Sequence, residues 1–364
     1  MCKRILASQT NTEEGVPFYK IGTIGNAPDA YISKELFDDY KTKYNYPHKG
    51  EVMITCAGTV GKCVIYDGKD AYYQDSNIVW IDNPSQCISN SFLYHLLAKV
   101  DWRKLNSTTI IRIYNDDLRN LKLSYPQIEE QQKISRLLSF LDERIATQSK
   151  IIDKLQSLIK GLNDTLYAQH GDEVMTSFAE LGTSYSGLSG KSAQDFGSGK
   201  PFITYLNVYS NNIINENDFQ YVAIKDGEKQ NIVEYGDVLF TLSSETPNEV
   251  GIGSVFLGKE KVYLNSFCFG IHITNKEVAF PPYLSYYVSS TAFRKFIYPY
   301  AQGSTRFNLC KADFEKASIK LPTLENQKWI YSILKRIASK IETEKKLLGL
   351  YNTQKQYLLR QMFI

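Results

Sequence analysis

Apolar residues follow two different periods along this chain, and the change of period divides it into four segments. In two stretches, apolar and polar residues alternate in short runs such as EVMITCAG (51–58) and NIVWID (77–82), which predict β-strands. In the two others, apolar residues recur in steps of three and four, the period of a long helix. The pattern predicts an α+β fold. The expected segments are a β-rich domain over 1–125, a helix over 126–170, a second β-rich domain over 171–321 and a second helix over 322–364.

The same order of elements occurs twice because the chain contains an internal repeat. PQIEEQQKISRLLSFLDERI starts at Pro126 and PTLENQKWIYSILKRIASKI starts at Pro322, an offset of 196 residues. The strand-forming stretch from 49 to 68 resembles the one from 235 to 258 in the same way. The repeat predicts two similar units related by a pseudo-two-fold axis. SFAELG (177–182) has no counterpart in the first copy, so we expect the first domain to lack a first strand.

Each predicted helix carries a continuous apolar stripe with the spacing of a coiled-coil seam. A helix of about 40 residues is about 60 Å long and does not expose such a stripe to water, so it requires a partner. The nearest partner is the other helix, and a two-fold repeat predicts antiparallel pairing. The expected seam residues are Ile134, Leu138, Leu141, Ile145, Gln148, Ile152, Leu155 and Ile159 in the first helix and Ile330, Leu334, Ile337, Ile341, Glu344 and Leu348 in the second.

Two polar residues interrupt these seams at equivalent positions, Gln148 in the first and Glu344 in the second. In an antiparallel pair the helix midpoints meet, so Gln148 would face Glu344 and donate a hydrogen bond to its carboxylate. The alternative interpretation is two solvated polar residues at a splayed seam.

Composition narrows the class of protein. The 364 residues are 43% hydrophobic and 13% aromatic, which indicates globular domains. The net charge is only +3, so any contact with nucleic acid must use local basic patches or a basic partner. The six cysteines show no CxxC spacing and the four histidines do not cluster with them, which argues against a zinc site. Scattered cysteines and the lack of a signal-peptide core or long apolar run predict a soluble cytoplasmic protein.

Two stretches resemble motifs of enzymes, but each lacks a residue that its motif requires. AGTVGKC (57–63) would need glycine at 56 and serine or threonine at 63 to bind phosphate as a Walker loop, and both positions are cysteine. We interpret it as a glycine-rich turn between two strands. FPPY (280–283) begins with a phenylalanine, which cannot accept a hydrogen bond from an adenine amino group, so we interpret it as a loop before a helix. No residue set suggests a nuclease or a nucleophilic enzyme, and we expect no catalytic residues and no bound metal.

The ends of the two copies resemble a known family. GSTRFNLCKADFEKASIKLPTLENQKWIYSILKRIASKI (303–341), IRIYNDDLRNLKLSYPQIEEQQKISRLLSFLDERI (111–145) and the stretch from 58 to 81 are similar to target-recognition domains of specificity (S) subunits in type I restriction–modification systems. The resemblance covers essentially the whole chain. It implies that each β-rich domain reads one half of a bipartite, asymmetric site on double-stranded DNA, and that the helices set the gap between the half-sites.

The resemblance also implies partners in a bacterial defence system that works through DNA methylation. The helices would dock two methyltransferase (M) subunits, and restriction (R) subunits would join through the complex. S-adenosylmethionine, ATP and Mg would bind to those partners, so this chain would be non-catalytic by itself. Two other interpretations stay open: a two-headed structural adaptor, and the recognition fragment of a fused restriction enzyme.

Residues that contact bases or phosphates would be basic or amide side chains on loops of each domain. The tyrosines at 40, 44, 46, 205 and 209 would stack on bases or contact phosphates, although core or rim positions are the commoner use. The candidate DNA-binding residues are Lys20, Lys62, Arg103, Lys104 and Arg112 in the first domain and Lys200, Arg294, Lys295, Arg306 and Asn308 in the second.

Overall fold

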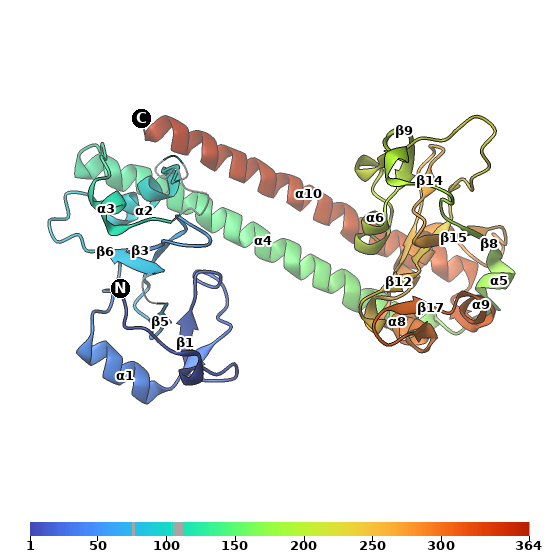
Figure 1. Ribbon diagram of the computed structural model, residues 1–364, viewed down its shortest axis with the longest axis horizontal. Helices are drawn as coiled ribbons and strands as arrows, with labels where there is room; N and C mark the ends of the chain where they lie inside the picture. The colour runs from blue at the N-terminus through green and yellow to red at the C-terminus, as the bar shows by residue number, and fades with distance from the viewer. Residues whose placement is uncertain (75–76, 103, 105–111, 364) are drawn as a thin grey trace. The chain divides into compact units, whose positions relative to one another are not determined.

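The chain divides into two compact units whose boundaries fall inside its two long helices. The computed structural model describes residues 1–74, 77–102, 104 and 112–363 (Figure 1). The long helices are α4 (Ile128–His170) and α10 (Leu324–Met362). Each unit therefore contains one globular part and a segment of each long helix. This division differs from the four predicted segments because the ends of the helices pack on the globular parts. The first unit is Met1–Ser149 with Lys346–Ile364, and the second is Lys150–Lys345.

The globular part of the first unit contains two three-stranded sheets, ordered β2-β1-β5 and β4-β3-β6. The two predicted strand runs form β3 and β6, which pair antiparallel. Phe37 of α1 is fully buried against the first sheet, and Trp102 is buried against the second. The elements are η1 (Ala7–Gln9), β1 (Val16–Tyr19), β2 (Tyr31–Ile32), α1 (Lys34–Lys43), β3 (Val52–Thr55), β4 (Cys63–Ile65), β5 (Tyr72–Tyr73), β6 (Ile78–Ile81), α2 (Asn90–Lys99) and α3 (Asn115–Arg119).

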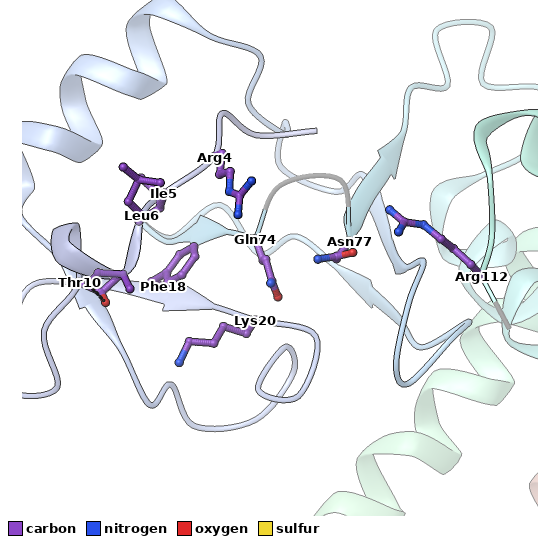
Figure 2. A pocket seen from close by; sticks show the side chains of 10 residues that line it. Arg4, Ile5, Leu6, Thr10, Phe18, Lys20, Gln74, Asn77 and Arg112 are labelled. Carbon is purple, nitrogen blue, oxygen red and sulfur yellow. Dashed lines mark hydrogen bonds between the residues drawn. The ribbon is translucent and has the colours of Figure 1, made fainter. Parts of the chain in front are cut away.

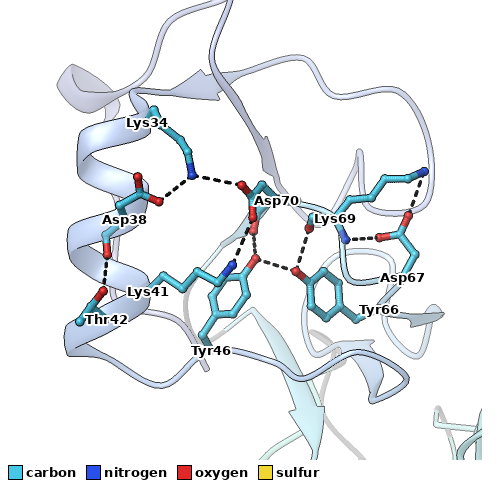
Figure 3. A network of polar contacts seen from close by, with 10 residues as sticks. Lys34, Asp38, Lys41, Thr42, Tyr46, Tyr66, Asp67, Lys69 and Asp70 are labelled. Atoms are coloured by element: carbon cyan, nitrogen blue, oxygen red, sulfur yellow. Dashed lines mark hydrogen bonds and ion pairs between the residues drawn. The ribbon is translucent and has the colours of Figure 1, made fainter.

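A polar network joins α1 to the segment that leads into β5 (Figure 3). Lys34 and Lys41 of α1 each place Nζ 3.1 Å from a carboxylate oxygen of Asp70. The hydroxyl groups of Tyr46 and Tyr66 lie 3.1 Å apart in the same network. The lysines are largely exposed, so these ion pairs contribute little free energy and the burial of apolar rings must hold α1 in place.

The globular part of the second unit is larger, and its main sheet has four strands in the order β13-β11-β15-β8. The smaller sheets have the orders β10-β9-β14, β12-β17-β16 and β18-β7. The elements are β7 (Val174–Ser177), α5 (Phe178–Leu181), β8 (Gly182–Ser186), η2 (Ala193–Asp195), β9 (Phe196–Ile203), α6 (Tyr205–Ser210), η3 (Glu216–Asp218), β10 (Gln220–Val222), β11 (Val238–Thr241), β12 (Ser243–Ser244), η4 (Pro247–Glu249), β13 (Gly253–Val255), β14 (Tyr263–Leu264), β15 (Cys268–Ile273), α7 (Pro281–Tyr287), α8 (Thr291–Ile297), η5 (Tyr298–Tyr300), β16 (Ala301–Gln302), β17 (Phe307–Leu309), α9 (Lys311–Lys316) and β18 (Ser318–Leu321).

The internal repeat extends to individual backbone hydrogen bonds. In the first unit, Cys56, directly after β3, donates its N–H to the carbonyl oxygen of Asn77, directly before β6, at 2.8 Å. The carbonyl oxygen of Cys56 accepts the N–H of Ile113 at 2.9 Å. In the second unit, Leu242, directly after β11, makes the equivalent two bonds: its N–H donates to the carbonyl oxygen of Phe267 at 2.9 Å, and its carbonyl oxygen accepts the N–H of Leu309 at 2.8 Å. These bonds align the two copies residue by residue where sequence identity is low. The aligned pairs are Cys56 with Leu242, Asn77 with Phe267, and Ile113 with Leu309.

One difference between the units lies in the sheet that contains β3 or β11. In the second unit β8 pairs with β15 as a fourth strand. The first unit, over the residues that the structure describes, has only β4, β3 and β6 in the corresponding sheet. SFAELG leads directly into β8, so the difference between the two sheets coincides with the stretch that has no counterpart in the first copy, and the lack of a first strand stays a prediction.

Within each unit the segments of the long helices pack antiparallel. In the first unit, Leu138 near the start of α4 shares an apolar cluster with Phe363 beyond the end of α10, and Asp142 forms an ion pair with Lys355. In the second unit, Leu166 near the end of α4 shares a cluster with residues near the start of α10. The antiparallel pairing that the repeat predicted is therefore present in both units.

The predicted seam residues are all buried or half-buried. The two polar seam residues, Gln148 and Glu344, are 6% and 7% exposed, and Glu344 forms an ion pair with Lys340 one turn earlier. Gln148 belongs to the first unit and Glu344 to the second, so their direct hydrogen bond stays a prediction. The fully buried members of the seam are Leu138, Ile330 and Leu334.

A fully buried glutamine attaches the start of α4 to the first unit. The amide nitrogen of Gln131 donates to the carbonyl oxygens of Pro126, at 2.8 Å, and Cys87, at 3.0 Å. Its amide oxygen accepts the N–H of Ser89, at 2.8 Å, just before α2. One side chain thereby joins the helix start, a loop and the start of a second helix.

Gln327 makes the same three bonds at the start of α10. Its amide nitrogen donates to Pro322, at 2.8 Å, and Val278, at 2.7 Å, and its amide oxygen accepts the N–H of Phe280, at 2.8 Å, just before α7. The proline and the glutamine that recur in the repeated sequence motif are thus the two ends of one hydrogen bond in each copy.

A buried histidine in α2 makes the first unit sensitive to acid. His95 is 2% exposed, and its Nδ1 has no hydrogen-bond partner among the described residues. Burial lowers the pKa of His95 from 6.5 to about 4, with nearby Asp142 raising the pKa and Lys355 lowering it. The unfolded chain therefore takes up this proton first as the pH falls below 6.5, and stability is lost between pH 6.5 and 4.

We expect the free energy of unfolding to fall by about 2 kcal/mol between pH 7.5 and 5 through His95 alone. Urea unfolding of the wild type and of His95→Leu at both pH values measures this difference. The control is His48→Leu, because the His48 side chain is 87% exposed. An equal pH dependence in the wild type and His95→Leu would contradict the prediction.

Candidate nucleic-acid interface

The first unit has a hollow of about 440 Å³, half of whose lining residues are basic or amide and the other half apolar residues and a threonine. Figure 2 shows Arg4, Lys20, Arg112, Gln74 and Asn77 around it. None of the described residues that line it is acidic, although Lys20 pairs with a neighbouring aspartate at 3.1 Å. Guanidinium, ammonium and amide groups are those that bind phosphate oxygens and the edges of purine bases.

Short strands hold these side chains from several parts of the chain. Lys20 follows β1 and Gln74 follows β5, and these two strands run parallel. The N–H of Gln74 donates to the carbonyl of Tyr19 at 2.8 Å, and its side-chain oxygen accepts the N–H of Ile21 at 3.2 Å. Asn77 directly precedes β6, so the strand fixes its backbone at the rim of the hollow. The site is therefore assembled by sheet pairing rather than by one loop.

The second unit has a hollow of about 340 Å³ with different chemistry. Tyr205 and Tyr209 of α6 line it with their rings stacked at 6.1 Å between centroids. Phe267, Glu245 and Arg306 line it as well. The side chain of Phe267 is 56% exposed, an unusual position for a ring of this size.

A second carboxylate in this hollow is held by the protein itself. Glu249 accepts hydrogen bonds from the hydroxyl groups of Tyr209, at 2.7 Å, and Ser244, at 2.9 Å. The Tyr209 hydroxyl lowers the pKa of Glu249, so this carboxylate stays ionised and fixes the orientation of the tyrosine. Glu245 makes no hydrogen bond or ion pair with the residues that the structure describes, and it is exposed.

Only three of the predicted DNA-binding residues line these two hollows: Lys20 and Arg112 line the first, and Arg306 lines the second. Lys62 lines a separate hollow of about 490 Å³ beside Trp102. Lys104 is largely exposed and lies 3.6 Å from Asp101, and Arg103 falls outside the described residues. Lys200, Lys295 and Asn308 are exposed on β9, α8 and β17.

Arg294 has a structural role. Its guanidinium group donates to the carbonyl oxygens of Asn248, Val250 and Gly251, each at 2.8 Å. Burial lowers its pKa. This side chain holds the loop before β13 against α8, and its donors are engaged within the unit.

Sequence reasoning missed Arg4, Gln74 and Asn77 in the first hollow and Glu245 and Phe267 in the second. Asn77 and Phe267 occupy equivalent positions before β6 and β15, as the repeated hydrogen bonds show. These two residues could have been found from the sequence, because each directly precedes an apolar run that predicts a strand. Aligning the two copies would have shown that they occupy equivalent positions.

Of the two rejected enzyme motifs, the first has the predicted structure and the second does not. Residues 57–62 form a turn between β3 and β4, and Cys63 begins β4; within the turn, Gly61 has φ +82° and a Cβ there would lie 2.2 Å from the Trp102 ring. The interpretation of FPPY as a loop before a helix was wrong, because Phe280 is the N-cap of α7 and Pro281 and Pro282 occupy its first positions, where proline is favoured. Among the described helices, none is both long and apolar enough to span a membrane.

Comparison with known proteins adds a family match. The sequence model described as the type I restriction modification DNA specificity domain matches residues 1–157 and 186–349. A protein of Haemophilus influenzae named as a type I restriction enzyme specificity subunit is 48% identical over 160 residues, which are 44% of this chain and 41% of that protein. A protein of Methanocaldococcus jannaschii named as the MjaX specificity subunit is 24% identical over 94% of this chain and 85% of its own length.

Solved structures share the fold. The S subunit of a type I restriction-modification system from M. genitalium has a TM-score of 0.54 at 16% identity, covering 100% of this chain and 92% of that chain. A chain from a study of complex assembly and conformational transition of the type I R-M system has a TM-score of 0.57 at 15% identity, covering 97% and 92%.

Proposed function

This chain belongs to the type I restriction modification DNA specificity domain family, and from that premise we propose that it reads a bipartite, asymmetric sequence on double-stranded DNA. Each globular part reads one half-site through its hollow, and α4 and α10 set the gap between the half-sites. The observation that carries the proposal is that the family match includes both copies of the repeat.

The contrast between the two hollows supports this assignment. Both units share a backbone framework down to equivalent hydrogen bonds, yet one hollow is basic and the other is aromatic and acidic. A common framework with different side chains is what reading two unlike half-sites requires. If the chain were a structural adaptor with two protein-binding heads, the guanidinium and amide groups that gather in one hollow would have no evident function.

We further propose that the chain acts as the non-catalytic specificity component of a larger complex. It would dock two methyltransferase subunits through the long helices, with restriction subunits joining through that complex. S-adenosylmethionine, ATP and Mg would be bound by those partners. The complex would work in the cytoplasm, where the DNA is.

The test is co-expression of the chain with a methyltransferase subunit from the same source, followed by single-molecule sequencing of methylated bases. We expect one non-palindromic motif with two specified halves and a fixed gap. Replacing residues 171–321 with the corresponding segment of a relative should change one half only. Methylation without a bipartite motif, or a motif that ignores the replacement, would overturn the proposal.

A further inference from the structure

The two hollows share one aligned lining position, Asn77 in the first unit and Phe267 in the second. Asn77 and Phe267 are aligned because each accepts, through its backbone carbonyl, the N–H of the residue after β3 or β11. Gln74 and Asn265 are aligned in the same way, because each donates its N–H to the strand β1 or β9, at 2.8 and 3.0 Å. At the one shared lining position, the amide side chain of the first hollow is replaced by an aromatic ring in the second, whereas the other lining residues come from different positions of each unit.

Two carboxylates line the second hollow, Glu249, which accepts from Tyr209 and Ser244, and Glu245, whereas none of the described residues that line the first hollow is acidic. Glu245 is exposed and has no hydrogen-bond or ion-pair partner among the described residues. A carboxylate repels the phosphates of DNA, so it is compatible with a bound duplex only opposite a hydrogen-bond donor on a base edge. In the major groove such donors are the amino groups of cytosine and adenine.

Cytosine fits this carboxylate better than adenine does. Cytosine presents its N4 amino donor alone, whereas adenine presents an N7 acceptor beside its N6 donor, and that acceptor would repel the second carboxylate oxygen. Arg306 lines the same hollow and matches the O6 and N7 acceptors of the guanine that pairs with the cytosine. Phe267 and Leu206, 56% and 67% exposed, offer apolar surface to the C5 edge of the pyrimidine.

We propose that Glu245 and Arg306 read one C·G base pair in the half-site of the second unit, with Phe267 packing against the cytosine. This inference rests on the proposed function and specifies the base pair that one hollow selects. Glu245 accepts from the cytosine amino group and Arg306 donates to the guanine. The first unit cannot make this contact, because no acidic residue is among the described residues that line its hollow.

The test uses the full chain co-expressed with its methyltransferase subunit, comparing the methylated motifs of the wild type and Glu245→Gln. Glutamine donates as well as accepts and pairs with adenine. We expect the discrimination for one C·G pair to fall about tenfold or more, with adenine tolerated at that position. The half-site of the first unit should be unchanged, and the segment replacement described above identifies which half that is.

Glu260→Gln is the matched control, since it removes the same charge from an exposed residue of the same unit that does not line the hollow. Phe267→Asn, which introduces the residue of the first unit, is the second variant and should weaken selection at the same position. If a variant abolishes methylation, selection of bound duplexes from a random-sequence pool by the purified complex supplies the readout.

An unchanged motif in both variants, or a second half-site without a C·G pair, overturns this inference while leaving the proposed function standing. A wild-type complex that shows no bipartite motif defeats the proposed function instead. A change of preference confined to the predicted base pair, with the control unaffected, supports the assignment of Glu245.

Discussion

Replacing Gln327 with leucine is expected to lower the free energy of unfolding by about 3 kcal/mol. Leucine has a similar size but removes all three hydrogen bonds of a side chain that is 0% exposed. It leaves the N–H of Phe280 and the carbonyl oxygens of Val278 and Pro322 buried without their partner. Each unsatisfied buried group costs about 1–3 kcal/mol, so the loss of three partners has a large effect.

Urea unfolding monitored by tryptophan fluorescence and circular dichroism measures this change. Gln156→Leu is the control, because Gln156 is an exposed glutamine in the part of α4 that belongs to the same unit. We expect that variant to stay within about 0.5 kcal/mol of the wild type. A Gln327→Leu variant as stable as Gln156→Leu would show that water replaces the lost amide.

Removing the three cations of the first hollow is expected to weaken DNA binding about a hundredfold at 0.15 M salt. The variant is Arg4→Ala, Lys20→Ala and Arg112→Ala together. If each cation neutralises one phosphate, the slope of log affinity against log salt falls by about 2.7, since each contact contributes about 0.9. Titration of a duplex that carries the methylated motif, at several salt concentrations, measures both quantities.

The control for this variant removes the same charge elsewhere on the first unit, through Lys99→Ala, Lys122→Ala and Lys133→Ala, all exposed. Its salt slope should stay close to that of the wild type. Equal losses in the two triple variants would show that net charge, and not the hollow, controls the affinity. A loss of affinity without a change of slope would assign the hollow to base contacts alone.

The long helices were the part of the fold that sequence predicted best. The recurring seam positions and a proline before each helix predicted their extent, and the helices begin at Ile128 and Leu324, two residues after Pro126 and Pro322. Local periodicity carries this information because one face of each helix must be buried along its whole length. The pairing of the β-strands carries no such local signal, since strands far apart in sequence make each sheet.

The candidate site was harder to predict for the same physical reason. Arg4, Lys20, Gln74 and Arg112 meet only after β1 and β5 pair and the residue following Arg112 bonds to the end of β3. A basic residue in the sequence also does not reveal which way it points. Arg294 shows this, since its guanidinium group turns inward onto three carbonyl oxygens.

The division of the chain into units has a consequence for its biosynthesis. The second unit is one continuous segment, Lys150–Lys345, whereas the first unit needs the last residues of the chain. Phe92 and Leu138 are covered in part by Phe363, which the ribosome adds only after the whole of the second unit. The first unit is thus begun first but completed after the second. During synthesis the second unit has all its residues available earlier, and the apolar surface around Phe92 stays uncovered, accessible to chaperones, until Phe363 has been added.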